Sequence, residues 1–269
     1  MRTPLQFFAL SISMLALASA AVGLERGRQE PIPVPGKAAA TEQAPVQMKA
    51  PNLEESATDH KHPAWLYVGS GEKKARHDAV ALAVRTKTWF KVKVYSFGLY
   101  LDLDAAAPLV KPFANKKWKD LMKDRNFDKA LLNDKVGKTV RLKMARDVDA
   151  DDMSEAFEDS LKPRIKTYNK KGTAEDRQAS DAAIKKFQGY FTKECKENQV
   201  LIFTALPGGR LLTSIDGKQM PEIKNMALTW ALFDIYLGDD PISENGKEAF
   251  VKALPTKLET RAAKKQKLP

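Results

Sequence analysis

A long strand with alternating side chains is the feature of this sequence that most constrains its fold. The run extends from 88 to 101, and at its start Phe90, Val92 and Val94 alternate with Lys91, Lys93 and Tyr95. Because successive side chains of a strand point to opposite faces, this alternation predicts one buried and one exposed face. After Tyr95 both faces become apolar or small. Gly98 inside the run indicates a bend or the close approach of another group.

Other periodic runs predict the remaining strands and helices. The expected strands cover 65–68, 79–84, 139–144, 199–206, 210–215 and a short run near 219–223. The expected helices cover a surface segment around 118–122 and the runs 153–161, 174–187, 225–237 and 244–254. Pro163 is expected to end or kink the helix that carries Met153, Phe157 and Leu161 on one stripe. Strands followed by helices predict an α+β fold, with helices on one face of a largely antiparallel sheet.

The first 62 residues lack this periodicity. Arg2 precedes an apolar run that ends at Ala18-Ser19-Ala20, which predicts a signal peptide over 1–20 because the run is short for a membrane span. Residues 21–62 are rich in Pro, Ala, Gln and Glu and predict a disordered linker or a second targeting segment. We therefore expect entry into the secretory pathway, with the protein secreted, kept in the endoplasmic reticulum or, if the leader is bipartite, sent to a plastid. The domain itself is expected over 63–255, followed by a basic tail over 256–269.

The charge of the chain is basic overall, with a formal net charge of +11. Residues 1–62 carry no net charge, so the excess of positive charge lies in the domain and in the tail. The tail has one acidic residue, Glu259, and five basic ones, which are Lys257, Arg261, Lys264, Lys265 and Lys267. A diffuse basic surface of this kind can favour peripheral contact with an anionic membrane. Aromatic and basic residues do not interleave, so no specific nucleic acid is expected as a partner.

Metal and catalytic motifs are weak in this sequence. The acidic run from Asp147 to Glu158 resembles a calcium loop, but Asp152 stands where that loop needs glycine. The His60-Lys61-His62 pair, His77 and the single Cys195 lack partners at ligand spacing. We expect no metal, no cofactor and no confidently assigned catalytic residue.

Arg85 and Tyr95 are the candidate binding residues in the long-strand region. A guanidinium binds a carboxylate through two parallel hydrogen bonds, and a phenol can add a third. In a sheet that bends, the two side chains can converge on one anionic group. Spacing alone favours the plainer alternative, which is an exposed arginine and a half-buried sheet tyrosine.

Four stretches resemble the chalcone isomerase superfamily, in the same order along the chain. They are 84–101, 139–148 leading into the helix 153–161, 227–238 and 239–243. The resemblance spans roughly 65–254. It implies an open-faced β-sandwich in which helices pack on one face of a large sheet, with a ligand cleft between sheet and helices.

The superfamily has an enzymatic and a non-enzymatic branch. True isomerases cyclise a chalcone with an arginine, a strand threonine, a helix tyrosine and an asparagine, whereas non-catalytic relatives hold a fatty-acid carboxylate with an arginine and a tyrosine. By resemblance the arginine matches Arg85, although a short gap leaves its register open, and the threonine position holds Tyr95. The helix tyrosine position holds Met153 and the asparagine position holds Ser160. A further hydroxyl of the isomerases matches Thr229.

Met153 separates the two branches, because a thioether cannot donate a hydrogen bond to a developing enolate. The resemblance therefore implies a non-catalytic, monomeric protein that binds a fatty acid or similar amphiphile through Arg85 and Tyr95. The expected pocket lining is Phe97, Leu99, Met153, Phe157, Ser160 and Thr229. Two alternatives stay open: an intramolecular lyase acting on an enone, and a basic membrane-surface or interaction protein.

Overall fold

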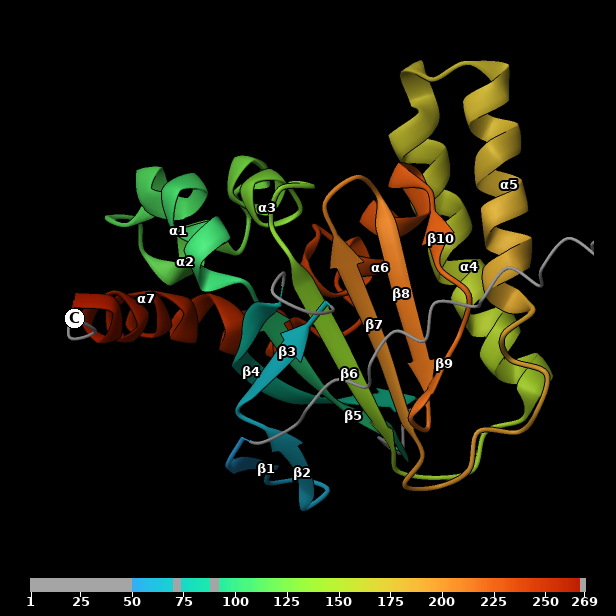
Figure 1. The fold of residues 1–269 in the computed structure, drawn as a ribbon, viewed down its shortest axis with the longest axis horizontal. Coiled ribbons are helices and arrows are strands. Elements are labelled where there is room, and N and C mark those ends of the chain that lie inside the picture. Colours follow the sequence, from blue (N-terminus) through green and yellow to red (C-terminus); the bar gives the residue numbers. More distant parts are fainter. Residues whose placement is uncertain (1–49, 70–73, 88–91, 267–269) are drawn as a thin grey trace, which may run out of the picture. The chain divides into compact units, whose positions relative to one another are not determined.

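A large antiparallel sheet is the centre of the fold in the computed structural model, which describes residues 50–69, 74–87 and 92–266 (Figure 1). The order of its strands is β10-β8-β7-β6-β5-β4-β3, with β9 paired to β8. The strands are β3 (Trp65–Val68), β4 (Ala75–Lys87), β5 (Val92–Leu101), β6 (Lys138–Met144), β7 (Val200–Leu206), β8 (Arg210–Ile215), β9 (Lys218–Gln219) and β10 (Ile223–Lys224). This confirms the predicted antiparallel sheet. Residues 88–91, the start of the expected long strand, lie outside the described residues.

Seven α-helices are present in the described part of the chain. They are α1 (Leu103–Val110), α2 (Trp118–Leu121), α3 (Arg125–Leu131), α4 (Ala150–Tyr168), α5 (Ala174–Gln188), α6 (Met226–Leu237) and α7 (Glu244–Gln266), with short 3₁₀ turns at Lys111–Phe113 and Asn169–Lys171. The capping pair expected for α5 is confirmed, because Thr173 and Asp176 each accept a hydrogen bond from the other's backbone N–H. No helix of the described ranges is both long enough and apolar enough to cross a membrane.

The helices cover the sheet face on which Phe97 and Phe203 lie. Phe157 of α4 and Phe187 of α5 pack against Phe203 of β7, with ring centroids 5.5 and 5.6 Å away. Gly246 of α7 lies so close to β5 that a Cβ there would stand 2.7 Å from Cζ of Phe97. The α+β arrangement with helices on one face, predicted from the sequence, is thus confirmed.

The opposite face of the sheet is partly covered by a hairpin that the sequence did not predict. β1 (Asn52–Glu55) pairs with β2 (His60–Pro63), inside the range expected to be a disordered linker. The expectation was wrong for these residues, because buried His60 and His62 both contact Oγ of Ser96 on β5, at 2.7 and 2.9 Å. Such long-range contacts leave no periodic signal in so short a segment. The expected signal peptide and residues 21–49 of the linker lie outside the described residues.

Two helices are longer than the sequence suggested. α4 continues through Pro163, because Leu161 and Ile165 on either side are buried and hold the helix against the core. α7 continues to Gln266, so residues 256–266 are a helix and not the expected tail. Its last turns are held by Arg261 and Lys265, which both pair with Asp104 of α1 at 2.9 and 3.0 Å.

The sequence analysis missed α1 and α3. Both are short and follow an aspartate, Asp102 or Asp124, whose side chain accepts the first free backbone N–H groups of the helix. Too few residues follow each cap to produce a clear helical period. Together with α2 these helices form the connection between β5 and β6.

Candidate ligand-binding site

Arg85 and Tyr95 lie opposite each other on adjacent strands. They are register partners in the antiparallel pairing of β4 and β5, with a register shift directly after Arg85. Cross-strand partners share a face of a sheet, and Phe97, which is on the same face as Tyr95, is covered by α7. The structure therefore brings the two predicted residues together on the helix-covered face of the sheet.

Arg85 is half-buried and is bound to a neutral group. Its Nη1 donates a hydrogen bond to the carbonyl oxygen of Ile242 at 2.8 Å, in the loop between α6 and α7. Among the ion pairs of the described residues none involves Arg85. A guanidinium has five N–H donors, so most of them are available for an anionic ligand.

Tyr95 lies deeper, beside two further aromatic side chains. It is 8% exposed, and its ring centroid is 6.2 Å from that of Phe97. The Phe97 ring in turn lies 5.3 Å from that of Tyr236 on α6. Burial raises the pKa of Tyr95, while the neighbouring Tyr236 phenol and the charge of Arg85 lower it. The phenol of Tyr95 therefore stays protonated at neutral pH and can donate a hydrogen bond.

Tyr236 completes this group of polar side chains. It is 2% exposed, and its hydroxyl has no hydrogen-bond partner among the described residues. Burial raises the pKa of Tyr236 well above its ordinary value, the nearby Tyr95 adds to the rise, and Arg85 opposes it. The Tyr236 hydroxyl thus lies close to the Tyr95 phenol without making a well-formed hydrogen bond to it, and an acceptor placed between the two phenols and Arg85 would satisfy both.

The arrangement is suited to hold a carboxylate. Arg85 supplies the positive charge, and Tyr95 and Tyr236 supply neutral donors from different elements. Phe97 on β5 contacts both tyrosine rings, and Leu99 on β5 and Met153 on α4 are buried in the same large apolar core as the two tyrosines. A few polar anchors next to a largely apolar surface are typical of sites for small amphiphilic ligands.

The other residues expected to line the pocket are spread along the core. Phe157 stacks on Phe191, with centroids 5.2 Å apart, and belongs to an aromatic cluster between α4, α5 and β7. Ser160 is half-exposed, and its hydroxyl donates to the carbonyl of Ala156 in its own helix. The hydroxyl of Thr229 donates to the carbonyl of Gly209, and Thr229 lies two turns of α6 away from Tyr236. The structure does not bring these three residues to Arg85.

Two cavities lined by described residues lie beside α6, and neither of these two is lined by Arg85 or Tyr95. The first, of about 220 Å³, is lined by Lys138, Thr229 and Trp230 among others. The second, of about 390 Å³, lies over α3, α4 and α6 and is rich in aspartates. No group of three or more His, Cys, Asp or Glu side chains suited to a metal ion occurs in the described ranges.

Tyr236 is the residue of the group that the sequence analysis missed. It lies in the apolar run of α6, where nearly every side chain is buried and no single face stands out. The neighbouring Gly238 predicts where the helix ends. It does not predict in which direction the phenol of Tyr236 points. Only the packing of α6 on β5 brings Tyr236 to Phe97 and Tyr95.

Comparison with known proteins identifies the family. Residues 75–251 match the chalcone isomerase like family, and the chain belongs to it. This confirms the resemblance found in the sequence.

Two curated relatives of this chain are plant proteins. Fatty-acid-binding protein 1 of Arabidopsis thaliana is 26% identical over 164 residues, which cover 60% of this chain and 56% of that protein. Fatty-acid-binding protein 2 of the same plant is 26% identical over 176 residues, covering 63% of this chain and 42% of that protein. The chain thus spans about half the length of the curated relatives it matches.

The fold agrees with a solved structure. A crystal structure of an Arabidopsis thaliana fatty-acid-binding protein superimposes with a TM-score of 0.62 at 22% identity, covering 77% of this chain and 98% of that one. This likeness confirms the fold class: a large open antiparallel sheet with helices packed on it.

Proposed function

We propose that this protein binds a fatty acid or a similar carboxylate amphiphile, with the carboxylate on Arg85, Tyr95 and Tyr236. The observation that carries the proposal is the pairing of Arg85 and Tyr95 across β4 and β5, where the guanidinium has, among the described residues, a neutral carbonyl as its one recorded partner. A buried or half-buried cation beside two protonated phenols favours an anion over a neutral ligand. The fatty-acid-binding relatives support the same ligand class.

Binding is favoured over catalysis by Met153, which by resemblance stands where the isomerases have a helix tyrosine. Met153 of α4 is 4% exposed and offers an apolar, adaptable surface to an acyl chain. It has no proton to donate and cannot stabilise a developing enolate. Chalcone turnover by the wild-type chain that is lost in Arg85→Leu would replace the binding proposal by an intramolecular lyase.

The direct test is fatty-acid binding to the full chain after removal of bound lipid. Palmitate is titrated into the wild type, Arg85→Leu and Arg177→Leu, and binding is followed by native mass spectrometry. Arg177 is an exposed arginine of α5 and serves as the charge-matched control. We expect Arg85→Leu to weaken binding about tenfold or more, because it removes a charge-assisted contact. Equal affinities for all three proteins would refute the proposed site.

A further inference from the structure

A second polar anchor lies at the other end of β6, in the cavity of about 220 Å³. Met144, the last residue of β6, pairs with Tyr95, whereas Lys138, the first, lines the cavity. Six residues of strand separate the two, which is about 20 Å. The cavity is therefore a place distinct from the Arg85 site.

Lys138 is buried without a carboxylate. It is 4% exposed, its Nζ donates one hydrogen bond to the carbonyl of Asn133 at 3.0 Å, and no ion pair among the described residues involves it. Lys247, the other buried lysine of the described ranges, has a counter-ion. Lys247 pairs with Asp128 at 2.8 Å and also donates to the carbonyl of Gly238. Burial of an ammonium without a counter-ion is unfavourable, so Lys138 lacks what Lys247 has.

The nearest acidic side chain of the cavity is already engaged. Asp134 lines the same cavity, but its two carboxylate oxygens accept hydrogen bonds from the backbone N–H groups of Gly208 and Gly209 at 2.7 and 2.9 Å. It therefore holds the β7–β8 turn and does not reach Lys138. Burial lowers the pKa of Lys138 to about 8, and the charge of Asp134 only partly opposes this.

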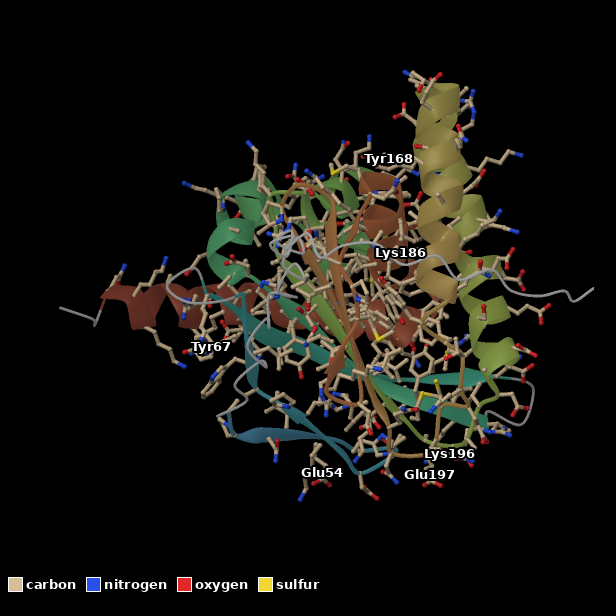
Figure 2. All side chains as sticks on the ribbon, turned by 45° about the vertical axis from the view of Figure 1, so that its right-hand side comes forward. Glu54, Tyr67, Tyr168, Lys186, Lys196 and Glu197 are labelled. Carbon is tan, nitrogen blue, oxygen red and sulfur yellow. The ribbon has the colours of Figure 1, made fainter. Side chains whose placement is uncertain are left out.

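The rest of the cavity wall is mostly apolar, with Lys129, Asn133 and Thr229 as its other polar side chains, and the cavity is open at its mouth. Phe233 lies under the ammonium of Lys138, 5.7 Å from ring centroid to Nζ, and Ala205 forms part of the wall. Tyr168 and Met226 are 41% and 42% exposed and also line the cavity; they are two of the four large hydrophobic side chains exposed in the described ranges. Figure 2 marks Tyr168 at the surface beside the helices. Exposed apolar side chains around a hollow are typical of a ligand entrance.

We propose that this cavity binds a small carboxylate with an apolar body, whose carboxylate pairs with Nζ of Lys138. A cavity of about 150 Å³ lined by apolar side chains is known to take up benzene. The present cavity is larger and adds a cation, so an aromatic acid of the size of benzoate matches it in volume and charge. This site is independent of the fatty-acid site at Arg85.

The test is a titration of the full chain with benzoate, followed by calorimetry. Benzyl alcohol, of the same shape without the charge, is titrated in parallel. Lys138→Met keeps the length of the side chain and removes the charge, and Lys166→Met, on an exposed lysine of α4, is the charge-matched control. We expect Lys138→Met to weaken benzoate binding about tenfold or more and to leave benzyl alcohol within about twofold.

A second variant controls for the case in which Lys138→Met does not fold. Ala205→Leu leaves the lysine in place and fills the cavity, so it should abolish binding of both probes while the circular dichroism spectrum is retained. In the wild type, benzoate affinity should fall as the pH rises above about 8, as Lys138 loses its charge. Asp134, Lys129 and Tyr168 are the other titratable groups that line the cavity.

The outcomes separate this site from the fatty-acid site. Arg85→Leu should bind benzoate as the wild type does, whether or not palmitate binds at all. The proposal is overturned if the folded wild type does not bind benzoate up to about 10 mM. It is equally overturned if Lys138→Met and Ala205→Leu both bind benzoate like the wild type.

Discussion

The phenols of Tyr95 on β5 and Tyr236 on α6 are neighbours, since each shifts the pKa of the other, and the ring of Phe97 lies 6.2 and 5.3 Å from the two tyrosine rings. Both phenols are almost fully buried, and the Tyr236 hydroxyl has no partner among the described residues. A buried hydroxyl without a hydrogen-bond partner lowers the stability of the ligand-free protein. It increases the affinity for a ligand that brings an acceptor. Stability and ligand affinity should therefore respond in opposite ways when this hydroxyl is removed.

Tyr236→Phe tests this relationship. The free energy of unfolding of the ligand-free protein should stay the same or rise by about 1 kcal/mol, because an unsatisfied polar group is removed without leaving a cavity. Palmitate affinity should fall about tenfold. Urea denaturation and native mass spectrometry measure the two effects. A loss of stability together with unchanged affinity would place Tyr236 in the core and not in the site.

Acid should destabilise the fold through its buried histidines. His62 and His77 are 0% exposed, and burial lowers the pKa of each from 6.5 to about 3. Nη1 of Arg141 lies 3.2 Å from Nδ1 of His62, so protonation of that ring would place two positive charges in contact. Between pH 6.5 and about 3 the unfolded chain binds more protons than the folded one, so stability is lost as the pH falls.

The size of this effect is measurable. Each histidine should reduce the free energy of unfolding by about 1.4 kcal/mol per pH unit below about 6.5. Urea denaturation of the wild type and His62→Gln at pH 7, 6 and 5 compares the slopes. We expect the free energy of unfolding of the variant to depend less steeply on pH than that of the wild type. Equal pH dependences would mean that the pKa of His62 is not lowered in the folded protein.

The contact between α7 and β5 depends on a glycine. A Cβ at Gly246 would stand 2.7 Å from Cζ of Phe97 and 3.2 Å from Cβ of Ala83. Gly246→Ala should reduce the free energy of unfolding by about 1–3 kcal/mol, as overpacking of a core does. It should also weaken palmitate binding, because Phe97 contacts both phenols. Gly189→Ala is the control, since a Cβ there meets nothing closer than 3.4 Å.

The basic end of α7 is expected to act mainly within the fold. Arg261 and Lys265 pair with Asp104 and hold the pKa of that carboxyl below its usual range. Arg261→Ala should reduce the free energy of unfolding by about 0.5–1 kcal/mol, whereas Lys264→Ala, on an exposed lysine, should not.

Deletion of 256–269 should leave co-sedimentation with anionic vesicles unchanged. Vesicle binding that is lost on deletion would favour the membrane-surface alternative.

The sequence by itself determined the sheet, most of the helices and the family. The strands β5 and β6, the buried stripe of Met153, Phe157 and Leu161 and the cap of α5 were found where local patterns predicted them. The expected single buried face was wrong: β6 is buried on both faces, and in β5 Val92 is exposed while Tyr95 is buried under the helices. Arg85 and Tyr95 were chosen from the sequence because they flank one connection and match the pattern of the family; the structure pairs them across β4 and β5, and their binding role stays a prediction.

Only the tertiary structure decided what stands beside those residues. Tyr236 reaches Tyr95 because α6 packs on β5. Among the described residues Lys138 has no counter-ion, because Asp134 turns to the β7–β8 loop. The β1–β2 hairpin is held by Ser96, and the end of α7 is held by Asp104, both far away in the sequence. The reason is physical: a periodic pattern reports which face of an element is buried, but burial alone does not say which side chains from other elements will meet there.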